Sequence, residues 1–353
     1  MAKGKRKIFI RALITAAVII VLLLFLQRLL MPKYAGDVLE GDVVEGGMID
    51  DYYDSDMDHD VVFIGDCEVY ENISTAVLWE EYGINSYIRG SAQQLIWQSY
   101  YLAEETLTYE TPDVIVFNVL SMQYDEPQKE TYNRMTLDGM RWSSSKVGSI
   151  LASMTSEESF IEYVFPILRY HSRWSELTSD DLTYFFGTPS YTFNGYYMRV
   201  DVEAAEDVPE GRVLGDYTFG DTAYEYLEKL TQLCEESGVE LVLIKAPSLY
   251  PEWYDEWDEQ IETYAAEHGL KYYNFLEMQE EIGLDWSQDT YDAGLHLNLS
   301  GAEKLAAFFG EILTEECGLE SRRGEEALEE EWEEILEAYD AEAARQYAVL
   351  EEE

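Results

Sequence analysis

The chain has few cysteines, and this shortage excludes one class of fold. Three occur in 353 residues, namely Cys67, Cys234 and Cys317. A disulfide scaffold needs several paired cysteines, so the fold must depend on a hydrophobic core. Cys234 and Cys317 lie in helical patterns and are predicted to be small buried hydrophobic side chains, although a bridge between them stays open.

Basic residues are scarce beyond the N-terminus. Residues 1–33 hold seven of the 23 Lys and Arg and none of the 72 Asp and Glu, so the rest of the chain has a formal charge of −56. Such a field repels polyanions, and we expect no nucleic-acid partner. A solvated acidic surface explains the charge, with adaptation to salt or to an acidic cell wall as variants. Among the few remaining cations, Arg89 and Lys245 fall at predicted strand ends, where a substrate could lie.

Motifs for metals and nucleotides are missing. No HExxH or CxxC pattern occurs, and the many carboxylates show no ligand spacing. No glycine-rich phosphate loop follows the first predicted strand either. We therefore expect neither a metal nor a nucleotide cofactor.

What the sequence does have, at its start, is a long apolar segment without acidic residues. Residues 8–31 are long enough to span a bilayer, which takes about 20 apolar residues. Basic residues precede this segment, and the first acidic residue is Asp37. The basic flank stays in the cytoplasm. We therefore predict a cytoplasmic tip at 1–7, a single-pass cell-membrane anchor at 8–31 and an extracellular main domain; a cleaved signal peptide is the alternative.

After an acidic stretch at 32–58, predicted to be a stalk, strands alternate with helices. Predicted strands are 61–64, 85–89, 113–120, 239–246 and 270–276, and predicted helices are 74–82, 92–109, 222–237, 253–268 and 302–315. This alternation implies a parallel sheet with helices on both faces, and five strands suit a flavodoxin-like order. We expect an α/β three-layer sandwich with a five-stranded parallel sheet over residues 59–318.

Two further segments flank or interrupt this pattern. Residues 121–220 are rich in Trp, Tyr and Phe and are predicted to form a mostly helical insertion that wraps the carboxyl edge of the sheet as a lid or a substrate-positioning insert. Its aromatic rings could stack on sugars or simply fill a core. Residues 319–353 are predicted to form an acidic C-terminal helix that docks on the domain or, as the lesser option, binds a partner.

Cys67 follows the first predicted strand. Val61 to Ile64 form an apolar run, and Gly65, Asp66 and Cys67 come next. The pattern predicts a buried strand and a strand-to-helix turn, which places the thiol at the sheet edge where α/β proteins bind ligands. The dipole of the following helix lowers the thiol pKa, whereas neighbouring carboxylates raise it, so the sign of the shift stays open.

A nucleophile needs a base, and the base needs a group that orients it. His296 fits the first role and Asp292 the second. His296 lies on a glycine-containing loop just before a capping-box pattern at 300–303, which starts the last predicted helix.

Together, Gly65-Asp66-Cys67 and the pair Asp292 and His296 resemble the motifs of the SGNH (GDSL-like) hydrolase superfamily. In that superfamily Gly-Asp-Ser ends the first strand and Asp-x-x-His comes late. Here cysteine replaces the serine, and the acid lies one residue further from the histidine, which leaves Asp289 as an alternate. The closer resemblance is to membrane-anchored SGNH-like proteins of bacterial cell envelopes, related to those of alginate acetylation and teichoic acid D-alanylation.

The resemblance implies a function and a site. Cys67 would be the nucleophile, and the oxyanion hole would combine the amides of Cys67 and Gly90 with the side chain of Asn118. The family's Gly-x-Asn-Asp is absent around Asn118. The implied activity is that of an acyl-ester hydrolase or O-acyltransferase acting on a cell-envelope glycan or another acylated substrate, with a membrane acyl-transfer protein as partner. The alternative is an inactive SGNH-fold binding or assembly partner in envelope biogenesis.

Overall fold

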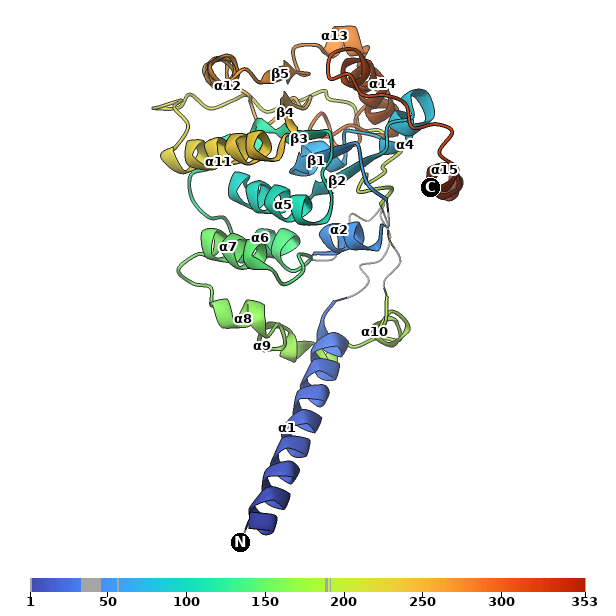
Figure 1. Ribbon diagram of the computed structural model, residues 1–353. Helices are drawn as coiled ribbons and strands as arrows, with labels where there is room; N and C mark the ends of the chain where they lie inside the picture. The colour runs from blue at the N-terminus through green and yellow to red at the C-terminus, as the bar shows by residue number, and fades with distance from the viewer. Residues whose placement is uncertain (1, 33–45, 56, 188–189, 191, 353) are drawn as a thin grey trace.

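A five-stranded parallel sheet forms the centre of the molecule (Figure 1). The computed structural model describes residues 2–32, 46–55, 57–187, 190 and 192–352. The strands are β1 (Val61–Gly65), β2 (Ser86–Gly90), β3 (Val114–Asn118), β4 (Glu240–Lys245) and β5 (Lys271–Asn274). Their order is β2-β1-β3-β4-β5, and all neighbours are parallel. The predicted flavodoxin-like α/β fold is confirmed.

Helices cover both faces of this sheet. The principal ones are α5 (Ile96–Tyr109), α11 (Asp221–Ser237), α12 (Asp255–His268) and α14 (Leu299–Glu315). Successive residues of a strand point to opposite faces. In β1, Val61 and Phe63 pack in a core shared with α14, whereas Val62 and Ile64 pack in a second core shared with α5, α11 and α12. Strand β1 is therefore buried on both sides, as its continuous apolar run predicts.

The elements between these helices are shorter than the sequence predicts. The predicted helix 74–82 is a short α-helical turn, α4 (Thr75–Val77), followed by a π-helical segment, η3 (Leu78–Tyr82). The strand predicted at 113–120 ends at Asn118, and a 3-10 segment, η4 (Val119–Gln123), follows it. A short helix, α13 (Gln279–Ile282), precedes the loop that leads to α14.

The N-terminal region contains one long helix and one short packed segment. Helix α1 (Ala2–Leu30) includes a stretch, Gly4–Leu30, that is long and apolar enough to span a membrane. Residues 33–45 and 56 of the predicted stalk lie outside the described residues. Residues 46–54 form α2 (Gly47–Asp50) and η2 (Asp51–Asp54) and pack on the domain, with Ile49 and Tyr52 buried. The stalk prediction is wrong for this part, because its apolar side chains belong to the domain.

The insertion divides into a helical half and an irregular half. The helical elements are α6 (Glu130–Leu137), α7 (Ser144–Ser153), α8 (Phe160–Val164), α9 (Ile167–Tyr170), η5 (His171–Ser175) and α10 (Asp180–Thr183). They extend from α5 towards the end of α1 (Figure 1), so they do not form the predicted lid. Residues 192–205 border the carboxyl edge instead: Tyr197 N donates to Tyr70 O at 2.8 Å, and Glu203 N to Thr290 O at 3.0 Å.

The C-terminal helix α15 (Glu326–Glu352) docks on the same domain. Trp332 is fully buried, and its ring stacks on Trp79 with centroids 5.3 Å apart. Its Nε1 donates to Asn85 Oδ1 at 3.0 Å. Further along, the hydroxyl groups of Tyr339 and Ser74 are 2.9 Å apart. Residues 319–353 were predicted either to dock on the domain or to bind a partner, and in the structure they dock on the domain.

Candidate active site

Cys67 lies at the carboxyl end of β1, where the backbone turns into a short helix, α3 (Cys67–Tyr70). Asp66 caps this helix, and its side chain accepts a hydrogen bond from Glu68 N at 3.3 Å. The thiol residue itself is partly exposed. Since α3 has only four residues, its dipole is much weaker than the one expected from the sequence.

His296 lies on the loop before α14, and Asp292 fixes its orientation. Asp292 Oδ2 is 2.6 Å from His296 Nδ1, and Asp292 Oδ1 accepts from the His296 backbone N at 2.8 Å. One carboxylate therefore holds both the ring and the backbone, so Nε2 is the ring nitrogen left for a reactant. This Nε2 is buried and has no hydrogen-bond partner of normal geometry among the described residues.

Asp289, the alternate acid, has a different role. Its side chain accepts from Asp285 N at 2.7 Å, Ser300 Oγ at 2.8 Å and Lys304 Nζ at 2.5 Å. These contacts hold the loop to the first turns of α14. The structure therefore places Asp292, and not Asp289, against the histidine.

The side chains of Cys67 and His296 interact. The pKa of each responds to the other, because His296 lowers that of the thiol by its charge and by a side-chain hydrogen bond, and Cys67 raises that of the imidazole. Among the described residues, however, Nε2 has no hydrogen-bond partner of normal geometry. The residues predicted as nucleophile, base and acid thus come together from two distant parts of the chain.

The protonation states differ from those of a neutral thiol beside a neutral base. Burial raises the pKa of Cys67 above 9.0, and the charge of His296 only partly opposes this. Burial also works against a charged His296, but the charges of Glu71 and Cys67 and the hydrogen bond that the ring donates to Asp292 outweigh it and raise the imidazole pKa well above 6.5. The raised pKa of the imidazole favours the protonated ring, which is the form that would stabilise a Cys67 thiolate.

A second carboxylate, which the sequence reading missed, also faces the histidine. Glu71 follows Cys67 by four residues, and its Oε2 is 3.6 Å from His296 Nδ1. Tyr291 donates its hydroxyl proton to the same oxygen and stacks on the imidazole, with ring centroids 5.9 Å apart. Arg199 lies over the Tyr291 ring at 4.4 Å. The i, i+4 spacing of Cys67 and Glu71 is the signal that could have found this residue, because it puts both side chains on one helical face.

Two of the three predicted oxyanion donors, Cys67 and Gly90, lie at the carboxyl edge of the sheet. The Cys67 amide is the first of α3, and such an N–H has no partner within its own helix. Gly90 pairs in register with Gly65 at the same sheet edge. A Cβ on Gly90 would lie 3.1 Å from the Tyr70 ring, so the close packing favours glycine there.

Asn118 does not fit the third role. Its Nδ2 donates to Asp66 Oδ1 at 3.1 Å and to Glu68 Oε2 at 3.0 Å, and its Oδ1 accepts from Ala246 N at 3.0 Å. An amide has two donor hydrogens, and both are already used. The prediction for Asn118 is therefore corrected: it ties the turn after β1 to β4.

The two cations predicted near a substrate are buried ion-pair members. Lys245 is fully buried, and its Nζ is 2.9 Å from both carboxylate oxygens of Glu68. Arg89 is also fully buried, 2.8 Å from Glu105 and stacked over Tyr52 at 4.1 Å. Neither meets solvent, so the expectation that they contact substrate is wrong.

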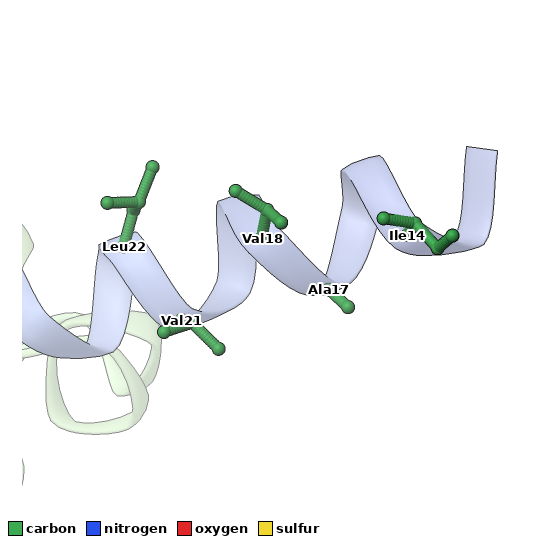
Figure 2. Close-up of a pocket in the computed structure, with 5 residues that line it drawn as sticks. All are labelled: Ile14, Ala17, Val18, Val21 and Leu22. Atoms are coloured by element: carbon green, nitrogen blue, oxygen red, sulfur yellow. The ribbon is translucent and has the colours of Figure 1, made fainter. Parts of the chain in front are cut away.

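The described residues contain no metal-binding group, and the apolar hollow on α1 lies away from Cys67. Within the described ranges, no group of three or more His, Cys, Asp or Glu side chains could hold a metal ion. A hollow of about 330 Å³ lies on α1 (Figure 2). It is lined by Ile14, Ala17, Val18, Val21 and Leu22. All five are apolar and come from one exposed helix, so this hollow is unrelated to Cys67.

Comparisons with known proteins give structural similarity without sequence similarity. No family model and no curated protein matches the chain. Similar solved structures include a G-D-S-L family protein from Desulfitobacterium hafniense (12% identity, 72% of this chain and 98% of that chain, TM-score 0.36). A GDSL-like lipase from Bacteroides thetaiotaomicron (13%, 73% and 88%, TM-score 0.34) and a catalytic mutant of an acetylxylan esterase from Geobacillus stearothermophilus (12%, 75% and 97%, TM-score 0.33) also match. TM-scores below 0.5 do not establish a family for this chain.

Proposed function

We propose that the protein is a membrane-anchored SGNH-like acyl-ester hydrolase or O-acyltransferase of the bacterial cell envelope, with Cys67 as nucleophile. The observation that carries this proposal is the orientation of His296. Asp292 holds Nδ1 at 2.6 Å, while the buried Nε2 is unpartnered and the ring interacts with the Cys67 thiol. A nucleophile, a base and an orienting acid in this relation are the minimum for acyl transfer.

The reaction follows from these positions. The Cys67 thiolate attacks the ester carbonyl carbon, and the amides of Cys67 and Gly90 stabilise the oxyanion. As the tetrahedral intermediate collapses, the carbon–oxygen bond of the ester breaks and the proton on His296 Nε2 passes to the leaving alcohol. Water or an acceptor hydroxyl then attacks the thioester and gives its proton to Nε2. The thiolate leaves, and the starting pair is restored.

The candidate membrane helix narrows the substrate class. If α1 anchors the chain with its basic end in the cytoplasm, the domain meets the polymers of the cell envelope. Their acylated sugars supply both the esters to cleave and the hydroxyls to receive an acyl group. A membrane acyl-transfer protein is the partner that would load Cys67 in the second case.

One observation favours the alternative, an inactive binding or assembly partner. Burial raises the pKa of Cys67, so the reactive thiolate is a small fraction at neutral pH. A chain that keeps the fold and the arrangement of Cys67, His296 and Asp292 without turnover would show the same contacts.

Ester turnover separates the two functions. The full chain in detergent should hydrolyse members of a panel of acetylated sugars and model acetyl esters, or transfer the acetyl group to an added sugar. Cys67→Ala and His296→Ala should abolish this activity, and Asp292→Asn should reduce it at least tenfold. Cys317→Ala is the matched control, because Cys317 is a partly exposed free cysteine away from the site. A panel without turnover, or activity that persists in Cys67→Ala, would leave the binding alternative.

A further inference from the structure

The helical half of the insertion carries an unusual set of exposed apolar side chains. They lie in α8, α9, η5 and α10 and directly after α10. We call this set the α8–α10 platform: Ile161, Phe165, Leu168, Trp174, Leu182 and Phe186. Trp174 is 73% exposed and Phe186 is 95% exposed. Exposed apolar side chains gathered on one surface indicate an interaction site.

The rest of the domain shows no comparable cluster among the residues that the structure describes. Outside α1 and the platform, its exposed large hydrophobic side chains are spread along the chain: Tyr109, Trp142, Leu151, Leu177, Val202, Val213, Tyr347 and Leu350. Single exposed apolar residues of this kind are normal. The platform is therefore a local feature.

The platform adjoins the end of α1. Arg173 NH1 donates to Leu30 O at 2.6 Å, and Arg28 Nε donates to Phe185 O at 2.8 Å. The rings of Phe25 and Phe185 are 5.0 Å apart. Figure 1 shows α8, α9 and α10 around the upper end of α1, across the direction in which that helix runs.

These contacts show how far below the end of α1 the platform reaches. Phe25 precedes Leu30 by five residues, which corresponds to about 7–8 Å along an α-helix. Phe185 therefore lies at the level of the last apolar turns of the span. Amphipathic segments in a membrane interface bury their apolar side to about 5–10 Å. The distance of Phe25 from the end of α1 therefore falls within the depth to which interfacial segments bury their apolar side.

From this arrangement we propose that the α8–α10 platform is inserted into the interface of the lipid leaflet from which α1 emerges, and so holds the domain against the bilayer. The inference rests on α1 being a membrane span and is independent of the proposed esterase function. The occupant is lipid, because the surface continues directly from the flank of a candidate membrane helix. Aromatic and aliphatic side chains at that level meet the headgroup and upper acyl region, where Trp is favoured.

Charge is consistent with this orientation. The chain beyond residue 33 has a formal charge of −56, which an anionic leaflet repels. Residues 160–186, which carry the platform, contain Arg169 and Arg173 against Glu162, Glu176, Asp180 and Asp181. This segment is less acidic than the domain as a whole, so an anionic leaflet repels it less strongly.

Quenching of tryptophan fluorescence by lipid tests the proposal. The full chain is reconstituted in nanodiscs of phosphatidylcholine, with or without phosphatidylcholine that is spin-labelled high on the acyl chain. We expect the labelled lipid to quench the wild type and Trp174→Phe to remove most of that quenching. Trp286→Phe is the control, because Trp286 follows α13 by four residues, and α13 lies at the far end of the domain from α1 (Figure 1).

A second pair of variants tests insertion without changing the reporter. Phe186→Glu should expel the platform and lower the quenching of Trp174 at least twofold, because a charge in the apolar region is costly. Val213→Glu, at a residue that is 93% exposed outside the platform, should leave it unchanged. Equal quenching in wild type and Trp174→Phe would overturn the proposal. Trp174 that is accessible in pure lipid but shielded in native membranes would assign the surface to a protein partner and would also overturn it.

Discussion

At the scale of single residues, Cys67 is subject to opposing electrostatic influences. Burial raises its pKa, the charge and hydrogen bond of His296 lower it, and the charges of Asp66 and Glu71 raise it again. Burial of a thiol among carboxylates disfavours the thiolate, whereas an adjacent imidazolium favours it. The histidine is therefore the one group of this set that promotes reactivity.

The pH dependence of alkylation should reveal this role. In the wild type the thiol pKa lies above 9.0, so the rate of Cys67 labelling by iodoacetamide should still rise beyond that pH. His296→Ala removes the influences that lower the pKa, so the thiolate should form at higher pH and labelling at about pH 8 should slow several-fold. Peptide mass spectrometry after short exposures measures each cysteine separately.

Cys234 provides an internal reference in the same experiment. It is buried in α11, and burial raises its pKa to about 12, so it should label slowly throughout. Faster labelling of Cys67 in His296→Ala than in the wild type would contradict the electrostatic role of His296.

Beneath the nucleophile, the ion pair of Glu68 and Lys245 is a stability element. Both side chains are fully buried, and Asn118 and Ser248 complete the hydrogen bonds of the carboxylate. Lys245→Met would leave a buried charge unpaired, which costs about 3–5 kcal/mol. Lys229→Met is the control, because Lys229 pairs with Glu225 on the surface, where a pair contributes about 0.5 kcal/mol. Urea unfolding of the detergent-solubilised chain measures the free energy of unfolding of both variants. An equal loss of unfolding free energy in the two would contradict the role given to the buried pair.

The site was only partly predictable from sequence at this scale. Cys67 and His296 carry short motif signals, whereas the spacing left Asp292 and Asp289 open as the acid, and the contact with His296 Nδ1 decides for Asp292. Glu71 and Tyr291 were missed, because their role depends on how α3 meets a loop more than two hundred residues later in the chain. Asn118 and Lys245 were misassigned for a related reason. A polar side chain at a strand end can point to a substrate or into the interior, and the hydrogen-bond partners that decide between the two are not visible in the sequence.

At the scale of elements, helix α15 is attached through several buried side chains, of which Trp332 is the largest. Trp332 is fully buried against Trp79, whereas Tyr347 near the other end of the helix is largely exposed. Trp332→Ala should cost about 3–5 kcal/mol of docking or folding free energy, and Tyr347→Ala much less. Hydrogen exchange of the amides in α15 measures the effect. Unchanged protection in Trp332→Ala would show that the helix is held elsewhere.

The sequence predicted regular elements better than irregular ones. Apolar runs such as Val61–Ile64 identify buried parallel strands, because such strands are apolar on both faces. The π-helical segment η3 was read as ordinary helix, since the two have nearly the same periodicity over five residues. Residues 46–54 were assigned to a stalk because they are acidic, although Ile49 and Tyr52 are enough to anchor them.

At the scale of the whole molecule, charge separates the chain into a basic tip and an acidic domain. Cations flank the cytoplasmic side of membrane helices, so the acidic domain should lie outside the cytoplasm. Protease added to intact, wall-stripped cells should therefore degrade the domain and leave residues near the N-terminus protected. A mature N-terminus beyond Met31, or a fully protected domain, would contradict the anchored topology.

The central claim is that Cys67 carries an acyl group during turnover, and trapping that intermediate tests it most directly. The full chain is mixed briefly with an activated acetyl ester, quenched in acid to preserve thioesters, and digested for mass spectrometry. The account predicts acetylation of the Cys67 sulfur in the wild type, faster than at Cys317, and at least a tenfold slower build-up in His296→Ala. Acetylation that is no faster at Cys67 than at Cys317, or that is unaffected by removal of His296, would contradict the account.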